Sequence, residues 1–103
     1  MDEKSNNPSG NIELSGFRDV DGSSMDIIRK MIGNHANRLG ELTKKLQKLH
    51  ITLKPIHERE KSEKYEIHAM IIDDGKVYSS EVVNRNLIVA VDKVLNKLIN
   101  ELD

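Results

Sequence analysis

The chain has 103 residues, no cysteine, and 16 basic against 17 acidic side chains, which gives a formal net charge of −1 at pH 7. The lack of cysteine excludes disulfides and thiol chemistry, and the near-neutral charge argues against a general polyanion binder, whose affinity depends on neutralised phosphates. Only Phe17, Tyr65 and Tyr78 are aromatic, so the core must be aliphatic, and few rings are available to stack on bases.

We expect one cytoplasmic domain over residues 11–103. No apolar run approaches the roughly 18 residues of a membrane span, and the N-terminus lacks the apolar stretch of a signal peptide. The first ten residues, Met1–Gly10, are polar and contain Pro8 close to Gly10, which indicates a disordered tail.

The first two predicted elements are a strand and a long helix. Asn11–Phe17 alternates apolar and polar residues up to Gly16, which is typical of a strand. Ser24–Leu49 is predicted to be a helix capped by Ser23 or Ser24, with Asp26 in its first turn. Its apolar side chains recur at steps of three and four, at Ile28, Ile32, Leu39, Leu42, Leu46 and Leu49. Because this phase continues past Gly33, we expect no break there.

The predicted first helix holds the whole positive excess of the chain. Between Ser24 and Leu49 six bases stand against two acids, whereas the rest of the sequence is slightly acidic. On a helical wheel five of the bases lie opposite the apolar arc: Lys30, Arg38, Lys44, Lys45 and Lys48. Such a face serves either solubility or contact with phosphates, and its one-sidedness favours phosphates.

Three more strands are predicted to follow. His50–Glu58 is interrupted by Pro55, which indicates an edge or a bulge, and Arg59–Lys64 is a charged turn. Tyr65–Ile72 and Lys76–Val83 form a hairpin around Asp74 and Gly75.

A second helix is predicted to close the chain, capped by Asn84 or Asn86. Its apolar stripe consists of Leu87, Val91, Val94, Leu95, Leu98 and Leu102. The order β-α-β-β-β-α predicts an α+β two-layer sandwich, in which a four-stranded sheet carries both helices on one face.

No motif indicates catalysis, a cofactor or a metal site. His50 and His57 fall on opposite faces of their strand, and no histidine pair has helical ligand spacing. His35 lies within the apolar stripe, where a packed or half-exposed imidazole is expected. Solvation accounts for the acids in and beside the charged turn, Glu58, Glu60, Glu63 and Glu66. We therefore expect a protein that is not an enzyme and binds no metal or cofactor.

Several short strings resemble the ribosome hibernation-promoting factor and ribosome-associated inhibitor family over about Asn11 to Leu102. They are Gly16 at the end of the first strand, Ile28–Ile32 with His35–Ala36 and Arg38–Leu39, and Ala90–Asp92 with Lys97–Leu98. The sequence departs from the family pattern at Met31, where the family has an aromatic residue, and at His35, where it has lysine. A few residues are also inserted after Gly16, and the chain ends without a basic tail.

The resemblance implies binding to ribosomal RNA on the small subunit near the decoding region, and inhibition of translation under stress or in stationary phase. By position, Arg29, Lys30 and Arg38 match basic or polar sites of the family. The nominated RNA-binding residues are Arg29, Lys30, Arg38, Lys44, Lys45, Lys48, Arg85, Lys93 and Lys97.

Two alternatives stay open at the level of sequence. Met31–Ala36 followed by Arg38–Leu39 resembles the helix, Gly-x-x-Gly loop and helix of a KH domain, with Ala36 in place of the second glycine. The other alternative is a protein-interaction or homodimerisation module that uses an uncovered sheet face bearing Val77 and Val83.

Overall fold

The computed structural model describes residues 11–57 and 63–103. Its elements are β1 (Asn11–Ser15), α1 (Gly22–Leu42), β2 (Leu46–His57), β3 (Glu63–Asp73), β4 (Lys76–Asn84) and α2 (Leu87–Leu102). This order confirms the predicted β-α-β-β-β-α sequence of elements. The tail Met1–Gly10 and most of the turn Arg59–Lys64 lie outside the described residues, although Glu63 and Lys64 already belong to β3.

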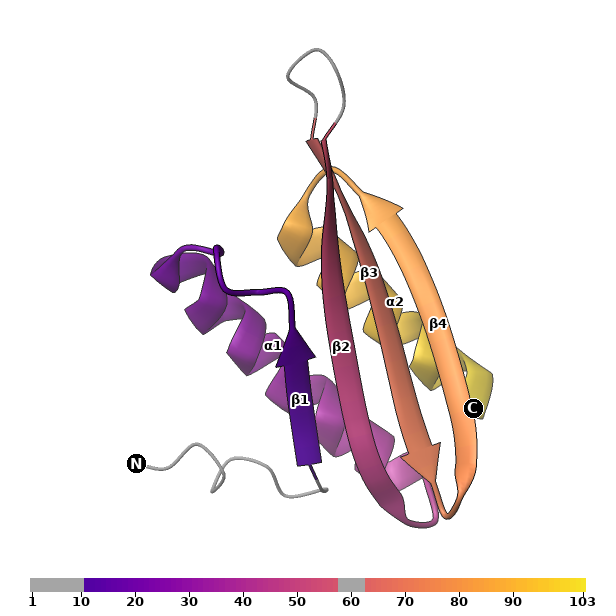
Figure 1. Ribbon diagram of the computed structural model, residues 1–103. Coiled ribbons are helices and arrows are strands. Elements are labelled where there is room, and N and C mark those ends of the chain that lie inside the picture. The colour runs from indigo at the N-terminus through magenta and orange to yellow at the C-terminus, as the bar shows by residue number, and fades with distance from the viewer. Residues whose placement is uncertain (1–10, 58–62) are drawn as a thin grey trace.

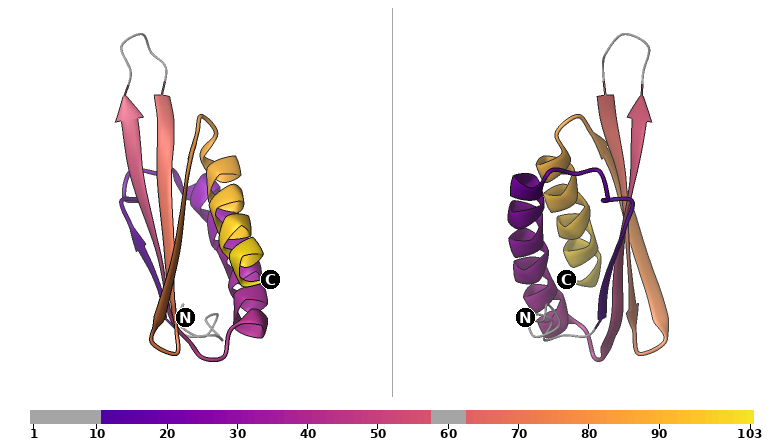
Figure 2. Two further views of the ribbon diagram at one scale, coloured as in Figure 1. Left: turned by 90° about the vertical axis from the view of Figure 1, so that its right-hand side faces the viewer. Right: turned by 60° about the vertical axis from the view of Figure 1, so that its left-hand side comes forward.

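The four strands form one sheet in the order β1-β2-β3-β4. β1 runs parallel to β2, and the other two pairs are antiparallel. The connection from β1 to β2 therefore crosses the sheet, and α1 makes that crossing. Both helices lie side by side on one face, and the other face has no helix over it (Figures 1 and 2). The predicted α+β two-layer arrangement is confirmed.

The core lies between the helices and the covered face of the sheet. Strand alternation directs Leu49, Ile51 and Leu53 of β2 toward the helices, each no more than 4% exposed. They meet Ile28 and Leu39 of α1 and the apolar stripe of α2, all within one hydrophobic cluster. Burial of each large aliphatic side chain contributes roughly 1.5–3 kcal/mol, so this single layer holds the fold together.

The predicted first helix extended too far at its C-terminal end. α1 ends at Leu42, and residues 43–45 form a turn before β2 begins at Leu46. The side chain of Asp73 fixes this turn, since its Oδ1 accepts the backbone N–H groups of Lys44 and Lys45 at 3.0 and 2.8 Å. The apolar steps from Leu42 to Leu46 and Leu49 fit a helix, but Leu49 also begins the strand alternation that buries β2.

The N-terminal end of α1 also differs from the prediction. Asp21 is the N-cap instead of Ser23 or Ser24, and its Oδ2 accepts hydrogen bonds from the Ser24 N–H and the Ser23 hydroxyl, each at 3.0 Å. These bonds lower the pKa of Asp21, with the Ser24 N–H the largest cause. The first turn of α1 contains no acid, so Asp26 lies one turn further along than predicted.

α1 is continuous through Gly33, as the phase of its apolar residues predicts. A KH domain requires a loop between two helices at this point. The unbroken helix therefore excludes the KH alternative.

Three local predictions are confirmed, two in the strands and one at the start of α2. Asp74 and Gly75 have positive φ angles of 52° and 87°, the combination of a tight two-residue hairpin turn. Pro55 lies beyond the five residues of β2 that pair with β1, so β2 is an edge on that side at Pro55, where a missing N–H is tolerated. Asn86 caps α2 through a 3.1 Å bond from the Val89 N–H.

Gly16 directly follows β1, at a position that no other residue fits. Its φ is +85°, and a Cβ atom there would lie 2.2 Å from the carbonyl oxygen of Leu53. The close approach lets the chain leave the sheet beside β2 and cross toward α1.

Candidate nucleic-acid interface

Five of the nine nominated bases lie on the two helices, with exposed side chains. We call this set the outer helix surface: Arg29, Lys30 and Arg38 of α1 with Lys93 and Lys97 of α2. The buried residues of both helices face the sheet, which leaves the opposite sides of the helices in solvent (Figure 2).

The other four nominated residues are distributed around the molecule. Lys44 and Lys45 are exposed in the turn after α1, and Arg85 is exposed between β4 and α2. Lys48 lies on β2, beside the uncovered face of the sheet, where its Nζ is 3.3 Å from Glu13 Oε1. The sequence predicts one continuous basic helix face that joins Lys30 and Arg38 to Lys44, Lys45 and Lys48. This prediction is wrong, because α1 ends at Leu42.

The outer helix surface keeps most of its positive charge available. Arg29, Lys30 and Lys93 form no ion pair with any other described residue, and Arg38 makes only an exposed contact of 3.4 Å with Glu41. Lys97 donates from Nζ to the backbone carbonyl of Glu81 at 2.8 Å, which directs it toward the free edge of β4. Exposed cations without acidic partners are the groups that contact phosphates.

A histidine and an aspartate also join the two helices. The Nε2 atom of His35 on α1 lies 2.9 Å from Oδ1 of Asp92 on α2. The His35 side chain is 18% exposed, which agrees with the expected packed or half-exposed imidazole. Asn96 donates to the other Asp92 oxygen at 3.4 Å. The contact links α1 to α2 through polar side chains, in addition to their shared apolar core.

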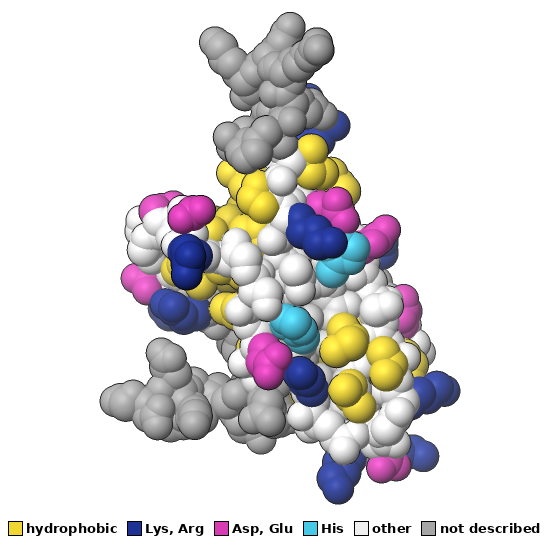
Figure 3. Space-filling view, viewed as in Figure 1, with side chains coloured by type: hydrophobic (Ala, Val, Ile, Leu, Met, Phe, Trp, Pro, Cys, Tyr) yellow, Lys and Arg dark blue, Asp and Glu magenta, His cyan; other side chains and the backbone are white. Residues whose placement is uncertain are grey.

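The uncovered side of the sheet, here called the open sheet face, has a different chemistry (Figure 3). His50 hydrogen-bonds the Ser15 hydroxyl at 2.8 Å. Val77 and Val83 are 58% and 52% exposed, as expected for an uncovered face. The bases here stand beside acids, as the contact of Lys48 with Glu13 shows. This face therefore has less free positive charge than the outer helix surface.

The open sheet face also holds a cluster that sequence reasoning missed: Glu66, His68 and Glu81. From the sequence alone Glu66 is one of the solvated acids beside the charged turn, and no pair of histidines has the spacing of metal ligands. The hairpin turn contained the signal, because counting back from Asp74 and forward from Gly75 places His68 opposite Glu81.

Within the described residues, no helix is long and apolar enough to cross a membrane. No protein-family model matches the sequence, and no curated protein matches it.

Solved structures do match. A ribosomal subunit interface protein from Coxiella burnetii superposes with a TM-score of 0.60 at 13% identity, covering 90% of this chain and 92% of that one. The N-terminal domain of Thermus thermophilus Protein Y gives a TM-score of 0.57 at 11% identity, covering 88% and 91%. This chain shares their fold. Both proteins are hibernation-promoting factor family members, the family that the sequence strings resemble.

Proposed function

We propose that this protein is a non-enzymatic RNA-binding factor that associates with the ribosome in the cytoplasm. It binds the small subunit near the decoding region and inhibits translation under stress or in stationary phase. The observation that carries the proposal is the match in fold, over 90% of this chain and 92% of the other, to a ribosomal subunit interface protein. The free charge of the outer helix surface supports it independently.

The proposed contact is between cationic side chains and the phosphates of structured RNA. The outer helix surface has no aromatic side chain, so it suits double-helical RNA recognised by shape and phosphate better than unstacked bases. Arg85 and the exposed Lys44 and Lys45 extend the contact at the ends of the helix layer. Lys48 takes no part in this proposal, because it lies in the other layer beside Glu13.

Sedimentation of cell extract through sucrose gradients at low and high salt tests the proposal. Because phosphate contacts release counterions, the protein should travel with small subunits at low salt and return to the top of the gradient at high salt.

The rival function is dimerisation or protein binding through the open sheet face, and the exposure of Val77 and Val83 favours it. That function predicts a complex at the top of the gradient that salt does not dissociate. Such a species, together with protein-free small subunits at low salt, would overturn the ribosomal proposal.

A further inference from the structure

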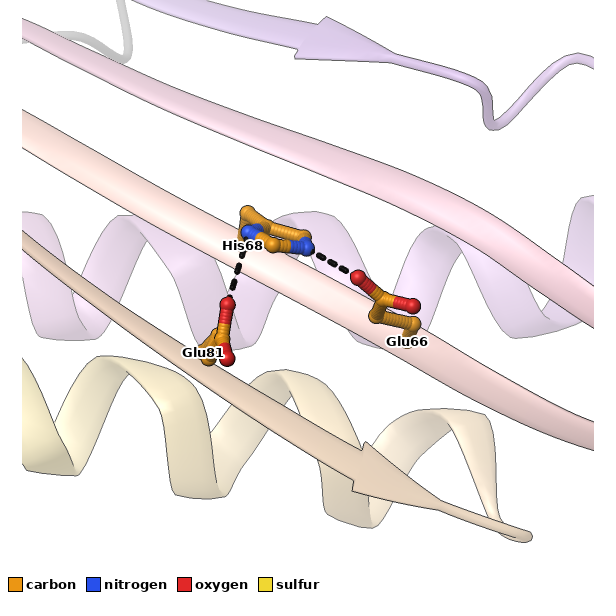
Figure 4. Close-up of side chains that lie close together, drawn as sticks. All are labelled: Glu66, His68 and Glu81. Atoms are coloured by element: carbon orange, nitrogen blue, oxygen red, sulfur yellow. Dashed lines mark hydrogen bonds and ion pairs between the residues drawn. The ribbon is translucent and has the colours of Figure 1, made fainter.

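On the open sheet face the imidazole of His68 lies between two carboxylates, one on its own strand and one on the neighbouring strand (Figure 4). Its Nε2 contacts Oε2 of Glu66, and its Nδ1 lies 3.3 Å from Oε1 of Glu81. The side chains of His68 and Glu66 are 35% and 30% exposed, and that of Glu81 is 69% exposed. The cluster is therefore set into the surface but open to solvent on one side.

The backbone of the hairpin positions all three side chains. Glu66 and His68 are two residues apart on β3, so they share a face, and His68 pairs directly with Glu81 on β4. Directly opposed residues on one face bring their Cβ atoms to about 5 Å, within reach of a shared ligand. The antiparallel β3–β4 ladder runs without interruption from the Tyr65–Asn84 pair to the Asp73–Lys76 pair, so the cluster is built on regular, hydrogen-bonded backbone.

We propose that Glu66, His68 and Glu81 bind a divalent transition-metal ion of the Zn²⁺ type, with solvent at the remaining position. One ligand atom from each residue lies within 4.8 Å of the other two. In a tetrahedral site with bonds of about 2.0–2.1 Å, neighbouring ligand atoms are about 3.3 Å apart, which matches the Nδ1 to Oε1 distance. One ring nitrogen of His68 binds the ion, so the Glu66 carboxylate, which contacts Nε2 in the structure, must turn toward Nδ1 for all three residues to bind it.

Charge favours a dication over a purely internal ion pair. A single imidazolium carries one positive charge against two carboxylates, so the cluster stays negative whether or not His68 is protonated. Lys54 lies opposite Glu66 in the register of β2 and β3 but forms no ion pair with it. Lys97 donates to the backbone carbonyl of Glu81 instead of to its carboxylate. A divalent cation bound to neutral imidazole neutralises both acids.

The donor set also selects among cations. Imidazole nitrogen suits Zn²⁺ and similar ions, whereas Mg²⁺ and Ca²⁺ take oxygen ligands. The site lies on the opposite face of the sheet from the helices, so a bound ion leaves the outer helix surface free. The inference therefore does not depend on the proposed function, and either can fail alone.

Calorimetric titration with ZnCl₂ tests the site, using the chain without a polyhistidine tag after removal of metal by EDTA. Wild type should bind one Zn²⁺ per chain, and excess Mg²⁺ should not displace it. His68→Gln and Glu81→Gln should each weaken binding at least tenfold, since each removes one of only three ligands. His50→Gln is the matched control, because His50 lies on the same face and bonds Ser15 instead of the cluster.

Absence of one-to-one binding in wild type would overturn the site. Binding that survives His68→Gln, or that falls equally in His50→Gln, would overturn it as well. Circular dichroism checks that each variant folds, and Glu66→Gln provides an independent third ligand test if either of the other two does not.

Discussion

The two faces of the sheet are built from the same strands but differ in burial and in chemistry. On β3 the residues Ile67, Ala69 and Ile71 are at most 1% exposed beneath the helices, whereas Glu66 and His68, on the same strand, face solvent. The covered face specifies the fold through aliphatic packing alone. The open face can therefore carry charged groups, including the proposed metal ligands, at little cost in stability.

The open sheet face also contrasts with the outer helix surface. Two basic groups on the open sheet face contact acids: Lys48 contacts Glu13, and His68 lies between two carboxylates that outnumber it. On the helices Arg29, Lys30 and Lys93 have no acidic partner among the described residues. Unmatched cations attract a polyanion more strongly than matched ones, and this difference is why we propose the helix layer as the surface that contacts RNA.

The largest expected effect separates the covered face from the open face. Ile67→Ala should reduce the free energy of unfolding by about 2–5 kcal/mol, because it removes a fully buried side chain and leaves a cavity. Val83→Ala, on the open face, should cost less than about 0.5 kcal/mol. Urea unfolding measures both. Equal losses would mean that a further layer covers the open face.

A smaller effect compares two histidines that each contact carboxylates. His35→Ala should cost about 1 kcal/mol, because it removes a part-buried bond between α1 and α2. His68→Ala, in the absence of metal, should change stability by less than about 0.5 kcal/mol, since its partners can be solvated. The same urea measurements decide this, and a larger loss at His68 would contradict the contrast.

The smallest effect concerns the start of α1 and depends on pH. Because the folded-state pKa of Asp21 lies below its usual value of 3.8, its carboxylate stabilises the fold above that value. This stabilisation is lost as pH falls through the lower folded-state pKa. Wild type should therefore exceed Asp21→Asn in thermal midpoint at pH 7, and the gap should close below about pH 4. A gap that does not change with pH would contradict the assigned cap.

Local signals predicted the fold, and tertiary contacts decided where local signals were ambiguous. Apolar alternation and the turn at Gly75 were sufficient to predict the strands of the sheet, and the apolar stripe was sufficient to predict α2. The spacing of Leu42, Leu46 and Leu49 is compatible with a helix and with a helix followed by a strand. Only the burial of β2 and the hydrogen bonds to Asp73 decide between the two structures.

The candidate site was predicted less completely than the fold. Extending the helix through Leu49 placed Lys48 beside Lys30, although the two lie in different layers. The cluster around His68 required the register of β3 against β4, and the contact of His35 with Asp92 required the packing of α1 on α2. A helical wheel describes one segment only, so it shows neither the register between two strands nor the packing of two helices.

The most direct test of the central claim is the affinity of the purified protein for small ribosomal subunits after matched charge reversals. One variant carries Lys30→Glu, Arg38→Glu and Lys93→Glu on the outer helix surface. Its control carries Arg18→Glu, Lys54→Glu and Lys76→Glu, three exposed positions outside that surface with the same change in net charge.

The helix variant should bind at least tenfold more weakly than wild type. The slope of its log K against log salt concentration should also be smaller in magnitude by about three, or about one for each lost phosphate contact. The control should stay within about threefold of wild type, since it loses no direct phosphate contact. Equal weakening of both variants, or undiminished binding by the helix variant, would contradict the account.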